Sequence, residues 1–333
     1  MYHGGKFKMQ QQRSRKILIL VLFLALIVGG IWYGGSQLFT SSSGKLKTVT
    51  IGYQAADEVD VSRLRGQLVK KMKKQGYKVV FKEFQNGSPE MQALASGKID
   101  YARVGDTPPI SALASGTKLT YIAEGGTKAS GSGVLVKKGS GINSVSDLKG
   151  KTIAYTVGTS SQYMVLKTLK LAGLKTSDVK LENMDSAAAA VAFAKGKVDA
   201  WAIWDPYVAK AELTESAKLL VNGKENKAVN RSFIVSPSSY SKKNTKVSKL
   251  LIKYMEEDMK WANKNTPALT KKMSKELKMS KSVIKKMLNR RTFKISAMNS
   301  EAIKEEQDIS NQFYAYKWIK TKVVIKNHIA NLK

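Results

Sequence analysis

A repeat within the chain constrains its fold more than any other feature. Residues 93–108, ALASGKIDYARVGDTP, match residues 192–207, AFAKGKVDAWAIWDPY, at an offset of 99 residues. Upstream of each match lie a β-rich start, a helical stretch that ends at a glycine, and a second strand. These segments fall at 48–52, 62–75 and 79–84 in the first copy and at 152–156, 160–172 and 179–184 in the second. Each copy therefore predicts strand–helix–strand–helix–strand.

Strands that alternate with helices at this spacing predict a parallel sheet with right-handed crossovers. Two copies predict two α/β lobes of similar plan with a cleft between them. Ligands of open α/β sheets bind beyond the carboxyl ends of the strands, where the N-termini of helices present unpaired N–H groups. We expect the loops at Asp106 and Asp205, which follow the third strand of each copy, to face this cleft.

The chain after the second copy of the repeat is rich in helices and contains no further copy. Helices are expected at 248–264, 266–277, 280–289 and 299–317, packed on the first lobe. Residues 130–135 and 230–235 are expected to form two hinge crossovers, and a hinged cleft can close around a small molecule. The first lobe is therefore assigned to residues 48–130 and 231–333, and the second lobe to residues 131–230.

The N-terminal region carries an apolar run at 17–33 that follows Arg13, Arg15 and Lys16, and no further charge occurs before Lys45. A helix of this length spans roughly 26 Å, close to a bilayer core. The basic flank predicts a cytoplasmic tail at 1–16, a transmembrane helix at 17–35 and a linker at 36–47. The binding domain is then expected on the extracytoplasmic side of the cell membrane. The alternative is a cleaved signal peptide and a secreted protein.

Composition excludes several classes of protein. The chain has no cysteine and only two histidines, His3 and His328. Disulfides, thiolate zinc sites, iron–sulfur clusters, cysteine nucleophiles and cysteine-linked lipid anchors are excluded, and we expect no metal, cofactor or catalytic residue. The net charge of +32 favours anionic ligands and surfaces. The lysines are scattered without a nucleic-acid-binding motif, so no nucleic-acid partner is expected, and the protein is expected to be a monomer.

An ordered set of motifs resembles one known family. The motifs are IGYQ at 51–54, EFQNG at 83–87, ALASGKID at 93–100, GDTP at 105–108, SDLKGKT at 146–152 and AIWDPY at 202–207, with looser matches at 289–291 and 311–314. The chain resembles the extracytoplasmic substrate-binding proteins of ABC importers for aliphatic sulfonates, taurine and nitrate. It departs from many Gram-positive relatives because it lacks the lipobox cysteine and carries the apolar N-terminal segment.

This resemblance implies the type II periplasmic-binding-protein fold and a receptor without catalysis of its own. Such a receptor passes a small anionic ligand to a membrane permease driven by a cytoplasmic ATPase. An aliphatic sulfonate is the expected ligand, with taurine, nitrate, bicarbonate or a thiamine-type pyrimidine as alternatives. A ligand sensor that serves no importer is a further alternative. An enzyme on a related two-lobed fold is disfavoured by the absence of cysteine.

The segment GTSSQ at 158–162 lies between a strand and a helix. Thr159, Ser160 and Ser161 can offer hydroxyl groups while neighbouring N–H groups point at an oxyanion, or the segment can be an ordinary helix N-cap. The family resemblance favours the anion site.

The loop that ends the third strand of the first copy contains the next candidates. Gly105 allows a ligand to approach the backbone, and Thr107 is the expected direct donor. Asp106 would repel an anion, so we expect it to orient a donor. The alternative is a plain helix start with Pro108 in its first turn.

Other candidates lie at strand ends and on the crossovers. Gln54 can bind an anion through its amide, or it can be a solvated strand end. Trp204 can form an apolar wall for an alkyl chain or pack in the core, and Asp205 can pair with an amine such as that of taurine. Arg231 can neutralise the ligand or be an exposed hinge residue, and Thr127 can close over the ligand.

Overall fold

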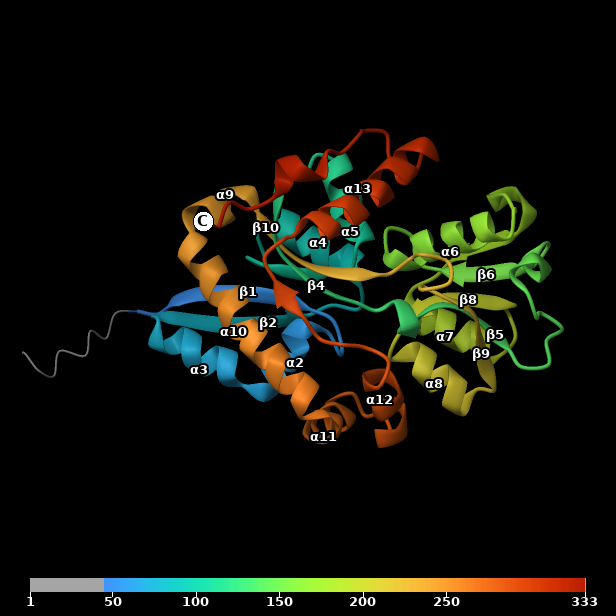
Figure 1. The fold of residues 1–333 in the computed structure, drawn as a ribbon, viewed down its shortest axis with the longest axis horizontal. Helices are drawn as coiled ribbons and strands as arrows, with labels where there is room; N and C mark the ends of the chain where they lie inside the picture. The colour runs from blue at the N-terminus through green and yellow to red at the C-terminus, as the bar shows by residue number, and fades with distance from the viewer. Residues whose placement is uncertain (1–44, 333) are drawn as a thin grey trace, which may run out of the picture. The chain divides into compact units, whose positions relative to one another are not determined.

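The computed structural model describes residues 45–332, and its first sheet contains strands from both ends of that range (Figure 1). Strands β1 (Lys47–Tyr53) and β2 (Tyr77–Glu83) pair in parallel, with Lys47 opposite Tyr77. Strand β1 also bridges Tyr101, just before β3 (Ala102–Val104). Beyond β3 follow β10 (Arg231–Pro237), β4 (Leu119–Thr127) and β11 (Ile295–Ser296), all paired antiparallel. We call this sheet and its helices the first lobe.

The second lobe is built on a five-stranded sheet. Its strand order is β7 (Lys180–Asn183), β6 (Thr152–Tyr155), β8 (Ala200–Trp204), β5 (Ser132–Lys137) and β9 (Ala217–Asn222). Strands β7, β6 and β8 are parallel, and β5 is antiparallel to both of its neighbours. Three parallel strands occur in both lobes, as the repeat predicted, and the antiparallel strand beside them in each lobe is an addition that the repeat did not predict.

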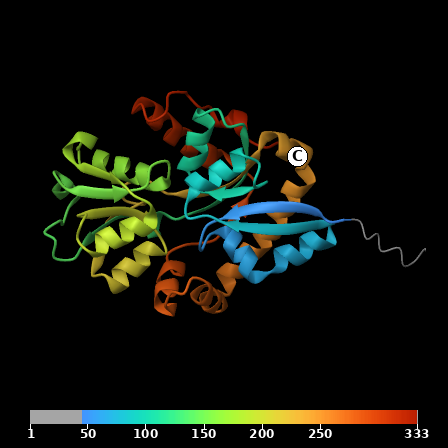
Figure 2. The ribbon, with the colours of Figure 1, turned by 180° about the vertical axis from the view of Figure 1, so that it is seen from behind.

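Helices cover both faces of each sheet, because each face carries an apolar set that must be buried. On the first lobe, α2 (Glu58–Arg65), α3 (Gln67–Lys74) and α10 (Thr245–Lys264) share one core. The opposite face is covered by α4 (Gly87–Ala95), α5 (Thr107–Ala114) and α13 (Ser300–Ala315). Figure 2 shows the same layers from behind. On the second lobe, α6 (Ser160–Leu171) covers one face, and α7 (Ser186–Ala194) and α8 (Tyr207–Thr214) cover the other.

The predicted helix at 62–75 is two helices in the structure. Helix α2 begins earlier, at Glu58, because the Asp57 side chain caps it by accepting a hydrogen bond from the backbone N–H of Asp60 at 2.7 Å. Gly66 ends α2 in the left-handed conformation, with φ of 77°, and α3 starts anew at Gln67. The break therefore follows from a glycine inside the helical pattern.

The C-terminal helices agree with the predicted segments to within a few residues. After α9 (Ser238–Lys243) and α10 come α11 (Thr266–Glu276) and α12 (Lys281–Leu288), followed by β11 and α13. Helix α11 packs on α2, and α12 contacts α8 of the second lobe. The segment after α12 is therefore held beside both lobes.

Two short crossovers connect the lobes. Residues 128–131, which include the short helix η1 (Ala129–Gly131), join β4 to β5, and residues 223–230 join β9 to β10. The backbone N–H of Lys128 donates to the carbonyls of Val229 at 3.0 Å and Asn230 at 3.2 Å, which ties the crossovers together. The crossovers were predicted slightly later, at 130–135 and 230–235. Those residues mostly form strands, because their apolar runs pair within a sheet.

The predicted transmembrane segment at 17–35 lies outside the described residues, as do the predicted tail and most of the linker. Between residues 45 and 332, no helix has both the length and the apolar character that crossing a bilayer requires.

Candidate functional site

The two lobes touch where the loop after β3 meets the start of α6. A Cβ atom placed on Gly105 would lie 2.4 Å from Ser160 Oγ and 3.1 Å from Asn230 Oδ1. Real Cβ atoms essentially never approach another heavy atom as closely as 2.4 Å. Gly105 therefore allows the first lobe, the second lobe and the second crossover to meet at one point, as expected for a residue where chains approach closely.

The structure separates the three hydroxyls of the predicted anion loop. Thr159 is the N-cap of α6, and its hydroxyl donates to the Thr156 carbonyl at 2.8 Å. The Ser161 hydroxyl lies 3.2 Å from the same carbonyl and accepts from the Thr156 N–H at 2.9 Å. Thr159 and Ser161 thus stabilise the turn before the helix, which is the N-cap alternative. Ser160 faces Gly105 and the first lobe.

Asp106 and Thr107 are both buried at the start of α5. The Thr107 hydroxyl donates to Asp106 Oδ1 at 3.2 Å, so it is directed at its neighbour. Burial raises the pKa of Asp106, and the Ser160 hydroxyl and the positive charge of Lys128 oppose that shift. Asp106 therefore lies against a serine of the other lobe, and its orienting role stays a prediction.

Gln54 is buried inside the first lobe. Its side-chain amide donates to Glu90 Oε2 at 2.9 Å and to the Arg103 carbonyl at 3.3 Å. Its backbone N–H donates to Asp57 Oδ2 at 2.7 Å. Both amide hydrogens thus have partners within the lobe, so Gln54 supports the buried charges beside it.

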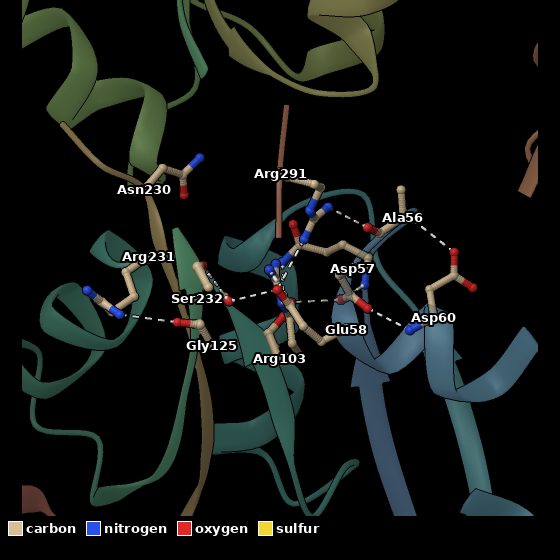
Figure 3. A network of polar contacts seen from close by, with 12 residues as sticks. Ala56, Asp57, Glu58, Asp60, Arg103, Gly125, Asn230, Arg231, Ser232 and Arg291 are labelled. Atoms are coloured by element: carbon tan, nitrogen blue, oxygen red, sulfur yellow. Dashed lines mark hydrogen bonds and ion pairs between the residues drawn. The ribbon is translucent and has the colours of Figure 1, made fainter. Parts of the chain in front are cut away.

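A cluster of buried charges lies beneath these loops, and the sequence analysis missed most of it (Figure 3). Arg103 of β3 donates to Glu58 of α2 at 2.5 Å and lies 3.8 Å from Asp57. Arg291, from the segment after α12, donates to Glu58 at 3.1 Å and to the Ala56 carbonyl at 2.7 Å. Glu58 is therefore neutralised by two arginines from distant parts of the chain, whereas Asp60 pairs with Arg63 of the same helix.

This arrangement sets the charge state of the two acids. Burial alone favours the neutral form of Glu58, but Arg103 and Arg291 outweigh it and lower the pKa of Glu58 to about 2. Burial dominates at Asp57 and raises its pKa to about 7, against the attraction of Arg103. Glu58 is thus a fixed anion, and Asp57 changes charge near neutral pH.

Lys128 is the other residue that the sequence analysis missed. It lies on the first crossover and is buried, with its Nζ 5.9 Å from the centre of the Trp204 ring. Trp204, at the end of β8, is half-buried and packs against the cores of both lobes. The indole thus lies at the junction of the lobes and packs in the core, which is one of its two predicted roles; a role as a wall for the ligand stays a prediction.

Asp205 has a partner within the chain. Both of its carboxylate oxygens bind Arg290, with Arg290 Nη2 at 2.6 Å from Oδ1 and Nε at 2.7 Å from Oδ2. Oδ1 also accepts from the Ala209 N–H at 3.0 Å. Asp205 was expected to pair with an amine of the ligand. In the structure its carboxylate is instead paired with Arg290, so we correct this expectation.

Arg231 and Thr127 lie opposite each other on β10 and β4. The Arg231 guanidinium binds Glu124 at 2.5 Å and Glu305 at 2.6 Å, so its charge is already neutralised. The proposed role of Arg231 as the ligand's counter-ion is corrected accordingly. Both residues line a groove of about 680 Å³, whose other lining residues include Ser130, Lys224, Arg290, Arg291 and Lys294. Through Arg291 this groove adjoins the buried charge cluster.

The fold and the junction define a class of protein. Two α/β lobes joined by two crossovers, with buried cations between them, are typical of hinged receptors for small molecules. In this chain Gly105 meets Ser160 at the junction of the lobes, and Lys128 lies over the ring of Trp204 nearby.

Comparison with known proteins assigns the family. Residues 72–265 match the family model described as NMT1/THI5 like. An Escherichia coli (strain K12) protein named as an aliphatic sulfonates-binding protein is 32% identical over 296 residues, which cover 88% of this chain and 92% of the relative. A Bacillus subtilis (strain 168) protein of the same name is 27% identical, covering 96% of this chain and 95% of the relative. The chain belongs to the NMT1/THI5-like family, and the resemblance inferred from its motifs is confirmed.

A solved structure agrees with this assignment. The alkanesulfonate-binding protein SsuA from Xanthomonas axonopodis pv. citri, bound to MOPS, superposes with a TM-score of 0.81. It is 27% identical, and the match covers 86% of this chain and 99% of that protein. The predicted periplasmic-binding-protein fold is therefore confirmed for the described part of the chain.

Proposed function

We propose that this chain is an extracytoplasmic receptor that binds an aliphatic sulfonate between its lobes and delivers it to an ABC importer. The observation that carries the proposal is the set of buried cations, Arg103, Lys128 and Arg291, at the junction of the lobes. Burying a charge is costly unless the charge is paired. Glu58 is the fixed counter-ion that the two arginines share, and burial raises the pKa of Asp57 and of Asp106 and so favours their neutral forms. An anionic ligand would therefore meet positive charge at the junction.

A sulfonate fits this junction for chemical reasons. It keeps its negative charge at every physiological pH, and its three oxygens only accept hydrogen bonds. The Ser160 hydroxyl can rotate from Asp106 toward such an oxygen, and the Lys128 ammonium has three hydrogens to donate. Trp204 supplies an apolar surface for the alkyl chain. The names of the relatives and the MOPS-bound structure support this ligand class.

The proposal includes a location and partners. The apolar residues 17–35 hold the binding domain at the outer face of the cell membrane, or act as a signal that is removed to release it. An importer consists of a permease and an ATPase, to which the receptor presents its ligand. The receptor itself catalyses no reaction.

The test is a thermal-unfolding screen of the full chain in detergent against alkanesulfonates of increasing length. The panel also contains taurine, nitrate, bicarbonate and a pyrimidine. A ligand at about 1,000 times its dissociation constant adds about 4 kcal/mol to the free energy of unfolding, which raises the melting temperature by several degrees. A shift with alkanesulfonates supports the proposal. A shift with only one of the other compounds would show that this compound, and not a sulfonate, is the ligand. The absence of any shift would favour a ligand sensor that serves no importer.

The site is tested by Ser160→Ala, with Ser186→Ala as the matched control. Both serines are buried first residues of second-lobe helices, but Ser186 begins α7, away from Gly105. We expect Ser160→Ala to weaken sulfonate binding by roughly 5- to 15-fold, the loss typical of one hydrogen bond. Ser186→Ala should leave binding unchanged. Equal affinities in both variants would remove Ser160 from the site.

A further inference from the structure

Lys128 has an unusual position for a lysine. It is 7% exposed, and its backbone is fixed at the crossover by hydrogen bonds to the carbonyls of Val229 and Asn230. Lysine is almost never fully buried unless its ammonium is paired. The place of Lys128 therefore requires an explanation.

The surroundings provide no such pair. Within residues 45–332, no atom accepts a hydrogen bond from Lys128 Nζ, and its one specific contact is the face of the Trp204 ring. Two carboxylates, Glu58 and Asp106, attract the Lys128 ammonium. Glu58 already binds Arg103, Arg291 and the Ser232 hydroxyl. Asp106 accepts from Thr107 through Oδ1, and its buried Oδ2 has no hydrogen-bond partner among the described residues.

Two further cations face the same ammonium. Arg103 reaches it from β3, and Arg291 from the segment after α12; both repel it, whereas Glu58 of α2 and Asp106 attract it. Arg291 also has a buried Nε with no hydrogen-bond partner among the described residues. Two donors with unused hydrogens thus lie together at the lobe junction, beside the aromatic ring that we assign to the alkyl chain.

We propose that Lys128 Nζ is the group that binds the anionic head of the ligand. Proton uptake on binding is an expected consequence, because an anion beside Nζ stabilises the charged ammonium. This inference rests on the proposed function and names the residue that serves it. Sequence motifs give no hint of it, because Lys128 stands between glycine-rich segments with no signature of its own.

The proton uptake follows from the charges around Lys128. Burial, together with Arg103 and Arg291, lowers the pKa of Lys128 well below its ordinary value. An anion at Nζ raises that pKa again, so binding of the anion favours uptake of a proton by Lys128. The pKa values of Asp57 and Asp106, which are raised by burial, would rise further beside an anion and add to the uptake.

The experiment is calorimetric titration of the full chain with butanesulfonate in two buffers of different ionisation enthalpy. The dependence of the measured heat on the buffer gives the number of protons taken up. We expect uptake in the wild-type protein. Lys128→Met should weaken binding by roughly 30-fold or more, as expected for a lost hydrogen bond between charged groups. Lys128→Arg keeps the charge at all pH values, so it should retain measurable binding with reduced uptake.

The matched control is Lys137→Met. Lys137 of β5 also lies over an aromatic ring, 4.9 Å from the centre of Phe193, but it donates to the Glu215 carbonyl and lies in the second lobe. Its replacement should leave affinity and proton uptake unchanged. Lys128→Met should also raise the melting temperature of the ligand-free protein, because it removes a buried charge without a partner. A structural lysine would give the opposite shift.

The outcomes separate this inference from the proposed function. If the wild-type chain binds no alkanesulfonate, the proposed function fails. If the wild-type chain binds butanesulfonate and the dissociation constant of Lys128→Met is within threefold of the wild-type value, Lys128 is not the residue that binds the anion. If the heat of butanesulfonate binding to the wild-type chain is the same in both buffers, no proton is taken up and that part of the inference is wrong.

Discussion

Arg290 and Asp205 form a bidentate ion pair that joins the two lobes. Arg290 follows α12 of the first lobe, and Asp205 follows β8 of the second; their closest atoms are 2.6 Å apart. Arg290 also binds Glu212 of α8 at 2.8 Å. Gly131 makes room for the pair, because a Cβ atom there would lie 2.1 Å from Asp205 Oδ2.

This pair is expected to stabilise the form in which the lobes touch. Arg290→Gln should therefore weaken ligand binding by about 5- to 50-fold, since less of the protein adopts the binding form, with a small change in melting temperature. Titration with butanesulfonate measures the loss. Lys304→Met is the control, because Lys304 pairs only with Asp308 on the exposed face of α13. Equal affinities for the wild-type protein and Arg290→Gln would show that the pair contributes nothing to closure.

Gly105→Ala should prevent the close approach of the lobes. The new methyl group would meet Ser160 Oγ at 2.4 Å, whereas Ser160 Cβ is at 3.7 Å, an ordinary contact. We expect affinity to fall more than about tenfold, with folding retained, because opening the cleft relieves the overlap. In a Ser160→Ala background the same substitution should cost much less, since the overlapping atom is gone. Additive losses in the double variant would argue that Gly105 acts in some other way.

Glu58→Gln tests the buried charge cluster. It leaves Arg103 and Arg291 without their counter-ion, so the free energy of unfolding at pH 7 should fall by about 3 kcal/mol. The folded-state pKa of Glu58, about 2, lies below the ordinary 4.5. Its contribution is therefore complete above about pH 5 and is lost as the pH falls from 4.5 toward 2.

The measurement is urea unfolding of the wild-type protein and Glu58→Gln at several pH values. The difference between them should shrink as the pH is lowered below 5. Glu301→Gln serves as the control, because Glu301 is exposed and lies 3.7 Å from Arg231. A difference that does not change with pH would contradict the assignment of Glu58 as the fixed anion.

Arg231→Met separates a structural role from a role in ligand binding. The arginine is paired with Glu124 and Glu305, and Glu124 keeps Lys294, Ser296 and Asn299 as partners when Arg231 is removed. We expect a loss of about 2 kcal/mol in the free energy of unfolding with affinity changed less than about threefold. Denaturant unfolding and ligand titration on the same sample test both statements. A large loss of affinity in a stable variant would restore Arg231 to the ligand site.

The order of elements and the two-lobed plan were predictable because they depend on local patterns. Apolar periodicity, glycines at helix ends and the 99-residue repeat occur within short stretches, and each determines a strand or helix regardless of distant residues. The same holds for Thr159 as an N-cap, which follows from its place between strand and helix. The helix break at Gly66 was visible in the sequence but was outweighed by the apolar pattern around it.

The site depended on contacts that no local pattern encodes. Asp205 and Arg231 had the expected positions, but their charges are taken by Arg290 and by Glu124 with Glu305. Which charges remain available is decided by pairing across the fold, so the sequence could not show that Asp205 and Arg231 already have partners within the chain.

The sequence by itself determined the α/β lobes, the family and the loops that meet at the junction, since these follow from hydrophobic pattern and short motifs. Only the tertiary structure decided that Glu58 neutralises Arg103 and Arg291, residues 45 and 233 positions away along the chain. Only the tertiary structure placed Lys128 in a buried position beside them. The physical reason is that the energy of a buried charge depends on every charge within a few ångströms, and folding alone brings those charges together.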